Sequence, residues 1–366
     1  MRKLTRQIKI GNVLIGGGAP VSVQTMVNAD PHDAAALLAQ IQEATDLGCD
    51  IVRLTVPDVK AAEAFKHVRQ ASPLPLVADI HFDYRLALAA LEAGADGLRI
   101  NPGNIGGADR VRAVVAAARV RQIPIRIGVN GGSLEKDILA KHGAATPEAL
   151  VESALRHVAV LEAEDYHEIK ISVKASDVPR TIAAYRLLSQ KTDYPLHLGV
   201  TEAGTFIPGT VRSSVALGAL LLEGIGDTIR VSLTDSPAKE VRVGVELLRC
   251  IGLRAPGAAV TSCPTCGRTR VDVAGMAMQV EERLEAFYRE HPKAPRPHVA
   301  VMGCVVNGPG EAKGADIAIA GGEGECMLFV RGEPTGKIPE SETVERIVQL
   351  VKQWQPPSPR LRRPGE

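Results

Sequence analysis

The stretch "LPLVADIHFDYRLALAALEAGADGLRINP", residues 74–102, contains one complete strand–helix–strand unit. Its ends, "LPLVADI" (74–80) and "GLRINP" (97–102), are short apolar runs of the length expected for buried strands. Between them, "DYRLALAALEAGAD" (83–96) has helical spacing and ends at Gly94, a residue type that favours the position just past a helix. A strand, a helix and a second strand in this order predict a parallel βαβ unit.

The same alternation continues on both sides of this stretch. Six more apolar runs of strand length follow one another with helical patterns between them: "VSVQTMV" (21–27), "IVRLTV" (51–56), "PIRIGV" (124–129), "EIKISVK" (168–174), "PLHLGVTE" (195–202) and "TIRVSL" (228–233). Eight strand–helix repeats within roughly 235 residues predict a closed (β/α)8 TIM barrel of the α/β class. An open doubly wound sheet is the alternative, but its Gly-rich first turn follows the first strand, whereas "GGG" (16–18) precedes it here.

The sequence on either side of the barrel predicts three further segments. Residues 1–20 contain "IKIGNVLIGG", whose alternation around Gly11-Asn12 predicts a hairpin beneath the floor of the barrel (21–254). Residues 255–355 begin with a Pro/Gly-containing linker and mix short strands with helical stretches, which predicts a smaller α+β domain. The Pro- and Arg-rich residues 356–366 predict a disordered tail.

Composition excludes several classes of function. Lys and Arg total 43 against 42 for Asp and Glu, so a basic site must be local, and 3% aromatic residues argue against a nucleic-acid stacking platform. No apolar run is long enough for a membrane span, and the start "MRKLTRQIKIGN" lacks the apolar segment of a signal peptide. Six cysteines in 366 residues do not form the pattern of a secreted disulfide scaffold, so we expect a cytoplasmic protein.

Polar residues recur at the carboxyl ends of the predicted barrel strands, where barrel enzymes place their chemistry. These residues are Arg53, Asp79, His81, Arg99, Asn101, Arg126, Asn130, Lys174, Glu202, Arg230 and Ser232. Five of them are cations from five strands, and guanidinium and ammonium groups suit phosphate oxygens, so we expect a substrate with at least two phosphates. Any single arginine could instead pair with an acidic residue inside the barrel. His197, in the middle of its strand, is expected in the core.

The smaller domain contains a second group of candidate ligands. "TSCPTCGRT" (261–269) brings Cys263 and Cys266 two residues apart, and "VMGCVVNGPGE" (301–311) adds Cys304. A structural zinc ion would complete a four-thiolate site with Cys326. An iron–sulfur cubane would use three thiolates and a weaker fourth ligand. The residues alone leave both alternatives open, together with cysteines that bind no metal.

Several motifs resemble those of one known family. They are "GLRINPGNIG" (97–106), "IRIGVN" (125–130), "ISVKAS" (171–176), "LGVTEAG" (198–204), "GIGDTIRVSL" (224–233), "SCPTCGRT" (262–269) and "GCVVNGPGE" (303–311). Together they resemble the compact, bacterial form of 4-hydroxy-3-methylbut-2-enyl diphosphate synthases, from about Gln7 to residue 350. The first strand reads "VQTMVNAD" (23–30) where that family commonly has a Ser-Met-Thr run, which leaves the contacts of Thr25 open.

The resemblance implies a cofactor, a reaction and partners. The cofactor is a [4Fe–4S] cluster held by Cys263, Cys266, Cys304 and Glu311, and a carboxylate ligand is more readily replaced than a thiolate. The reaction is the reductive opening of 2-C-methyl-D-erythritol 2,4-cyclodiphosphate to the linear allylic diphosphate. The resemblance further implies flavodoxin or ferredoxin as electron donor and a head-to-tail homodimer.

The implied roles complete the set of expectations. The cations, with Asn130, His81 and Ser232, would bind the diphosphate, Glu202 would deliver a proton, and Asn307 would orient groups beside the cluster. A zinc-containing barrel aldolase with a Schiff base on Lys174, and a phosphate-binding module without activity, are the competing hypotheses.

Overall fold

The computed structural model describes residues 2–255, 257–291, 293–306 and 308–356. The chain divides into two compact units, Met1–Arg254 and Ala255–Glu366. Residues 357–366, which make up most of the predicted disordered tail, lie outside the described residues. Among the helices in the described ranges, none is long and apolar enough to cross a membrane.

The first unit is built around eight parallel strands. They are β3 (Ser22–Met26), β4 (Ile51–Thr55), β5 (Leu76–Asp79), β6 (Gly97–Ile100), β7 (Ile125–Asn130), β8 (Ile169–Lys174), β9 (His197–Leu198) and β10 (Thr228–Ile229). They are ordered β8-β7-β6-β5-β4-β3-β10-β9. A parallel bridge between Ile171 and Leu196 joins the two ends of this order, so the sheet closes on itself. The predicted TIM barrel is therefore confirmed, and the open sheet was the wrong alternative.

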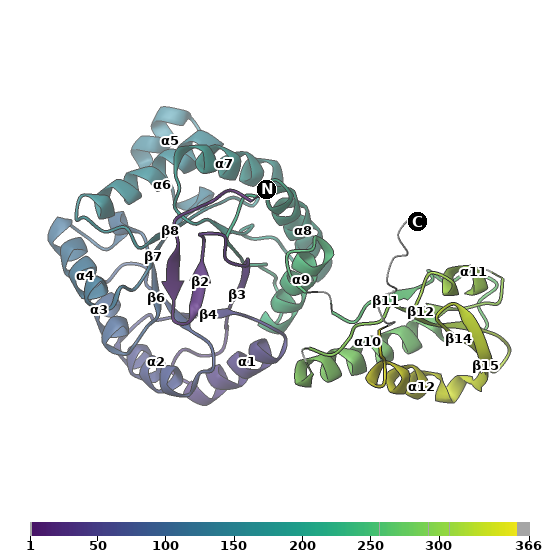
Figure 1. The fold of residues 1–366 in the computed structure, drawn as a ribbon. Coiled ribbons are helices and arrows are strands. Elements are labelled where there is room, and N and C mark those ends of the chain that lie inside the picture. Colours follow the sequence, from purple (N-terminus) through teal and green to yellow (C-terminus); the bar gives the residue numbers. More distant parts are fainter. Residues whose placement is uncertain (1, 256, 292, 307, 357–366) are drawn as a thin grey trace, which may run out of the picture. The chain divides into compact units, whose positions relative to one another are not determined.

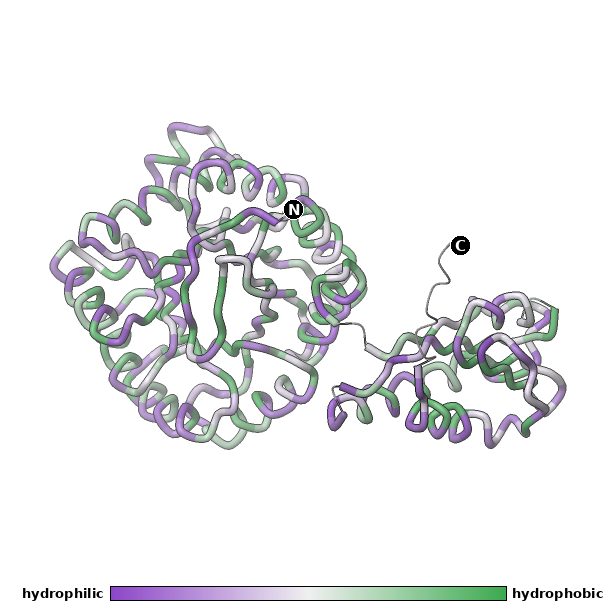
Figure 2. Tube along the Cα trace, in the orientation of Figure 1, coloured by the Kyte–Doolittle hydropathy of each residue, from purple (hydrophilic) through white to green (hydrophobic). Residues whose placement is uncertain are grey.

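Helices form a ring around the strands (Figure 1). They are α1 (Ala34–Asp46), α2 (Val59–Ala71), α3 (Tyr84–Glu92), α4 (Ala108–Arg121), α5 (Lys136–His142), α6 (Pro147–Glu162), α7 (Val178–Lys191), α8 (Phe206–Leu222) and α9 (Pro237–Cys250). Hydrophilic and hydrophobic residues alternate along the ring, as expected for helices with one face on the barrel (Figure 2). Aspartate residues cap the amino ends of the first three helices. The carboxylates of Asp33, Asp58 and Asp83 accept hydrogen bonds from backbone N–H groups of α1, α2 and α3.

The hairpin of β1 (Ile8–Ile10) and β2 (Val13–Ile15) packs at the amino ends of the barrel strands. Its buried isoleucines form one apolar cluster with Ile51, the first residue of β4, and Val77, the second residue of β5. Gly11 has φ +57° in the hairpin turn, where an added Cβ would lie 2.6 Å from Cβ of Pro75. The opposite end of the barrel is left for the predicted site.

The lumen of the barrel is unusually polar. Apolar residues Ile169, Ile171 and Val173 of β8 belong to the main core shared with the helices, so the alternate residues Lys170, Ser172 and Lys174 face inward. Lys170 is 2% exposed, and its Nζ has no hydrogen-bond partner among the described residues. Burial and the charge of Arg126 hold the pKa of Lys170 well below its usual range.

Replacing Lys170 with methionine is expected to raise the free energy of unfolding near neutral pH by roughly 1–3 kcal/mol, the cost of burying an unpartnered polar group. The folded pKa of Lys170 lies below the unfolded value, so between the two values unfolding takes up a proton. The free energy of unfolding of the wild-type protein should therefore increase as pH rises toward about 10.4. The extra stability of Lys170→Met over wild type should become smaller across the same pH range. Denaturant titrations of both proteins at several pH values measure this. Lys66→Met, an exposed lysine of α2, is the control, and equal pH slopes for wild type and Lys170→Met would contradict the prediction.

The second unit has a five-stranded sheet. Its order is β11 (Val260–Ser262), β12 (Val299–Met302), β13 (Ile317–Gly321), β14 (Glu325–Val330) and β15 (Glu333–Pro339). The first three strands are parallel and the last two antiparallel. Helices α10 (Val273–Glu290) and α12 (Glu340–Lys352) share one apolar core with the sheet, and the short α11 (Gly308–Ala312) contributes to a smaller cluster rich in alanine.

Candidate active site

Five cationic side chains project into the barrel lumen, although Arg126 is the second residue of β7 (Ile125–Asn130) and not at its carboxyl end as predicted. They come from four strands and from the residue that follows a fifth: Arg53 (β4), Arg99 (β6), Arg126 (β7), Lys174 (β8) and Arg230 (after β10). Burial lowers the pKa of Arg53 to about 10, although the charge of Asp79 opposes that effect. Burial and the nearby charges of Arg126 and Arg230 hold the pKa of Lys174 well below its usual range. The structure thus brings the predicted cations close enough to repel one another, which an anionic ligand would relieve.

Two buried carboxylates hold three of these cations in place. Asp79 lies 3.3 Å from Nη1 of Arg99 and 3.5 Å from Nε of Arg53. Burial raises the pKa of Asp79, but Arg53 and Arg99 outweigh it, so this pKa is below its usual range. On another side of the lumen, Glu240 of α9 lies 3.2 Å from Nη2 of Arg230. Two carboxylates against five cations leave an excess of positive charge.

Two glycines make room for the cationic side chains. A Cβ added at Gly199 would lie 2.4 Å from Nζ of Lys174, and one at Gly128 would lie 3.0 Å from guanidinium atoms of both Arg99 and Arg126. The side chains of Lys174, Arg99 and Arg126 therefore use the space that these glycines leave beside β7 and the end of β9. The sequence analysis missed both glycines. Their signal is a glycine at an inward position of a strand, in "RIGV" and "HLGV".

The remaining predicted residues of the barrel have different environments. Asn101 is buried, and its Oδ1 accepts a hydrogen bond from the backbone N–H of Gly128 at 3.0 Å. Asn130 ends β7, and Ser232 is half-buried in the loop after β10. His81 is exposed beside Phe82, with ring centroids 6.1 Å apart, and Glu202 is exposed with φ +52°. His197 is in the core, as expected, within 2.7 Å of the Thr228 hydroxyl.

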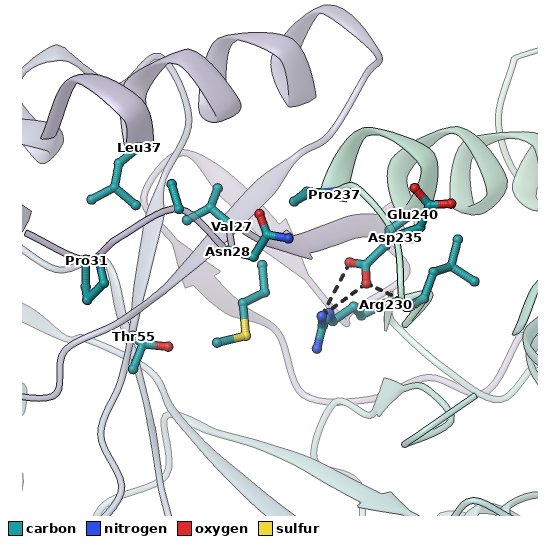
Figure 3. A pocket seen from close by; sticks show the side chains of 12 residues that line it. Val27, Asn28, Pro31, Leu37, Thr55, Arg230, Asp235, Pro237 and Glu240 are labelled. Atoms are coloured by element: carbon teal, nitrogen blue, oxygen red, sulfur yellow. Dashed lines mark hydrogen bonds and ion pairs between the residues drawn. The ribbon is translucent and has the colours of Figure 1, made fainter. Parts of the chain in front are cut away.

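A cavity of about 360 Å³ lies beside Arg230 (Figure 3). It is lined by Met26, Val27, Asn28, Ala29, Pro31, Leu37, Thr55, Arg230, Leu233, Asp235, Pro237 and Glu240. The lining therefore combines apolar side chains at one side with the Arg230–Glu240 ion pair, which Figure 3 marks by dashed lines. The cavity adjoins the ends of β3 and β4 and the loop after β10.

Two of the three candidate thiols follow neighbouring strands of the second unit's sheet, at their carboxyl ends. Cys263 follows β11 and Cys304 follows β12, and carboxyl ends of neighbouring parallel strands lie side by side. The backbone N–H of Cys263 donates to the Val301 carbonyl at 3.2 Å, and the N–H of Gly303 lies 3.3 Å from Sγ of Cys263. Cys266 is exposed. Between the two cysteines, Thr265 has φ +55°, a left-handed conformation that tightens the Cys-x-x-Cys turn.

The predicted fourth ligand, Glu311, lies seven residues after Cys304 in the sequence. Glu311 is exposed in α11, and the backbone N–H of Gly308, the first residue of α11, donates to the carbonyl of Cys304 at 3.2 Å. Asn307, predicted to orient groups there, lies outside the described residues. Within those residues, no three His, Cys, Asp or Glu side chains are already grouped as metal ligands. Three accessible thiols and a carboxylate near one sheet edge nevertheless fit the donor set of an iron–sulfur cluster.

Cys326 has a different environment from the other three thiols. It is fully buried in β14, within the apolar core that α10 and α12 share with the sheet. Burial raises the pKa of this thiol, which disfavours the thiolate that metal binding needs. The four-thiolate zinc site would require this sulfur to leave the core, so the structure favours the three-thiolate alternative.

Comparisons with known proteins agree with these observations. A solved structure of 3-dehydroquinate dehydratase from Geobacillus kaustophilus HTA426 has a TM-score of 0.50 and 16% identity, covering 68% of this chain and 99% of that one, which shows a shared barrel fold alone. Residues 5–245 match the family described as GcpE TIM-barrel domain, and residues 259–353 match the GcpE protein C-terminal domain.

Curated relatives match over nearly their whole length. A protein of Geobacter sulfurreducens is 56% identical over 352 residues, which are 96% of this chain and 98% of that protein. A protein of Clostridium perfringens is 53% identical over 351 residues, with 96% and 99% coverage. Both are named 4-hydroxy-3-methylbut-2-en-1-yl diphosphate synthase (flavodoxin). The resemblance carried by the motifs is thereby confirmed, and the chain belongs to the GcpE family, in which these diphosphate synthases are its relatives.

Proposed function

We propose that this chain converts 2-C-methyl-D-erythritol 2,4-cyclodiphosphate into 4-hydroxy-3-methylbut-2-enyl diphosphate. Counted for the fully protonated diphosphates, the reaction takes up two electrons and two protons, breaks the ring and releases one oxygen as water. Relatives at 53–56% identity with this activity in their names support the proposal. The observation that carries it is the group of five cations in the barrel lumen, which suits a diphosphate.

The charges of the five predicted cations and their two carboxylate partners suit the substrate. Five cations and the carboxylates of Asp79 and Glu240 sum to a net charge of +3 when all are ionised, and to +2 when Lys174 is neutral. A cyclic diphosphate with one charge per phosphate would balance most of this excess. Guanidinium groups donate to phosphate oxygens in pairs, so the arginines fix the orientation as well as the charge of the ligand.

The polar neighbours are assigned different roles. Asp79, which the sequence analysis grouped with the substrate-binding residues, is assigned instead to hold Arg53 and Arg99, since a buried carboxylate would repel phosphate. Ser232, Asn130 and His81 are assigned to the diphosphate. Exposed Glu202 is assigned to proton delivery, which needs a carboxyl group that can reach both substrate and solvent.

Cys263, Cys266, Cys304 and Glu311 are assigned to hold a [4Fe–4S] cluster. When bound, such a cluster supplies electrons one at a time. The names of the relatives favour flavodoxin over ferredoxin as the donor. The head-to-tail homodimer stays a prediction.

Anaerobic purification with metal and sulfide analysis, followed by turnover of the cyclic diphosphate with reduced flavodoxin, tests the proposal. We expect a brown protein with about four irons per chain and negligible zinc, because a cubane contains four irons. Formation of the linear diphosphate should require the reduced donor. A colourless protein that contains one zinc per chain and is active without a reductant would contradict the proposal and favour the aldolase hypothesis.

A further inference from the structure

Glu240 is a buried carboxylate with every oxygen occupied. It lies in the first turn of α9 and is 4% exposed. Its Oε1 accepts from Nη2 of Arg230 at 3.2 Å and from the backbone N–H of Leu233 at 2.9 Å. Its Oε2 accepts from the hydroxyl of Thr25 at 3.0 Å and from the same Nη2 at 3.4 Å. Figure 3 shows the ion pair at the wall of the cavity.

These contacts join the first barrel strand to two consecutive segments at the end of the barrel. Thr25 lies in the first barrel strand, Arg230 and Leu233 lie at the end of the last one, and Glu240 lies in the helix that follows. Leu233 is the neighbour of Ser232, so Glu240 fixes the backbone on one side of a proposed phosphate contact and the guanidinium on the other. Thr25, whose contacts the sequence left open, thus acts through Glu240.

The geometry of Arg230 indicates that it is held ready for another ligand. Only its Nη2 contacts Glu240, and its buried Nε has no hydrogen-bond partner among the described residues. Guanidinium donors that the protein leaves unpaired can donate to a phosphate oxygen. An arginine that served the fold alone would direct more of its donors to the protein.

We infer that Glu240 is a positioning residue for the diphosphate site, holding Arg230 in the geometry that binds substrate. The inference rests on the proposed function, and it assigns Glu240 no contact with the substrate, since both of its oxygens are engaged with protein groups. Removing its charge should therefore affect substrate affinity through Arg230.

The chain offers a closely matched control at the opposite end of the same strand. Asp227 precedes β10 and is 2% exposed. It also accepts from one arginine, one hydroxyl and one backbone N–H, namely Arg2 at 3.2 Å, Thr5 at 3.0 Å and Leu196 at 2.9 Å. Its contacts serve the floor of the barrel, so Asp227→Asn measures what losing such a buried carboxylate does to the fold alone.

The test is anaerobic calorimetric titration of the cluster-loaded protein with the cyclic diphosphate, together with its KM and kcat. For Glu240→Gln we expect a dissociation constant raised about tenfold, equivalent to about 1.4 kcal/mol, with KM raised more than kcat is lowered. The dissociation constant of Asp227→Asn should stay within about twofold of wild type, since this substitution should change only the stability of the fold. In an Arg230→Gln background, Glu240→Gln should add less than about twofold, because residues that act through one contact are not additive.

Each outcome decides the inference. An unchanged dissociation constant for Glu240→Gln overturns it, and so does a tenfold loss that persists undiminished after Arg230→Gln, since Glu240 would then act independently of Arg230. Glu240→Asp keeps the charge but shortens the reach, and it should show a smaller loss of the same sign if Glu240→Gln does not fold. A wild-type protein that binds no cyclic diphosphate would instead contradict the proposed function, before any variant is compared.

Discussion

Replacing Cys304 with alanine is expected to leave the protein almost without iron and without reductase activity, whereas Cys326→Ala should retain both. Cys304 follows β12, and Cys263 follows the neighbouring parallel strand β11. A thiolate is a strong ligand to iron, and two remaining cysteines with one carboxylate are too few to hold a cubane. We expect iron to fall from about four per chain to below about one.

The control variant separates loss of a ligand from loss of a cysteine. Cys326 is fully buried in the core under α10 and α12, so its truncation should lower stability by about 1 kcal/mol through lost packing while the iron content stays normal. Iron and sulfide analysis with thermal unfolding of both variants measures this. Loss of iron from Cys326→Ala, with Cys304→Ala still loaded, would restore the four-thiolate site that the structure disfavours.

The barrel could be predicted from the sequence because its signal is repeated eight times. Each strand is an apolar run of limited length, and helix stops such as Gly48 and Gly94, both with positive φ, mark where the next strand begins. The last two strands were predicted too long. "PLHLGVTE" and "TIRVSL" form strands only at His197–Leu198 and Thr228–Ile229, since the residues that follow leave the sheet ladder as the chain enters the loops that carry Glu202 and Ser232.

The cations of the site could be predicted, but their supports could not. A charged residue at the end of an apolar strand is conspicuous in a sequence, as Arg99 and Lys174 are. Glu240 is not, because in "PAKEVRVGVELL" it has the spacing of an ordinary amphipathic helix, and its partners lie 10 and 215 positions away. Gly128 and Gly199 matter for what they lack, and only coordinates show which side chains use that space.

Glu311 could be found only through the resemblance to a family. From the residues alone it reads as an exposed acidic residue after a Gly-Pro-Gly turn, and the structure places it exposed in a helix of five residues. Neither observation distinguishes a ligand from a solvated side chain. A variant of Glu311 is therefore the most informative single test of the ligand set.

Glu311→Gln is expected to keep a substantial part of its iron while losing most of its reductase activity. An amide has the size of the carboxylate but no negative charge, so it binds iron more weakly, while three thiolates still hold the cluster. Because Glu311 is exposed and its buried neighbour Ala312 is unchanged, the fold should not be affected. Iron content and electron paramagnetic resonance of the reduced variant, recorded with and without the cyclic diphosphate, measure this.

The result expected for Glu311→Gln differs from that of losing a surface charge and from that of losing the whole cluster. Glu323→Gln, another exposed acid of the second unit, removes the same charge and should change neither the spectrum nor turnover. A cysteine variant loses the iron and the activity together, whereas Glu311→Gln should separate them, with an altered spectrum on the iron that remains. That separation is what a replaceable oxygen ligand predicts and a structural carboxylate does not. Wild-type turnover with an unchanged spectrum in Glu311→Gln would mean that the fourth ligand is another group, and the three thiolates would stand without an assigned partner.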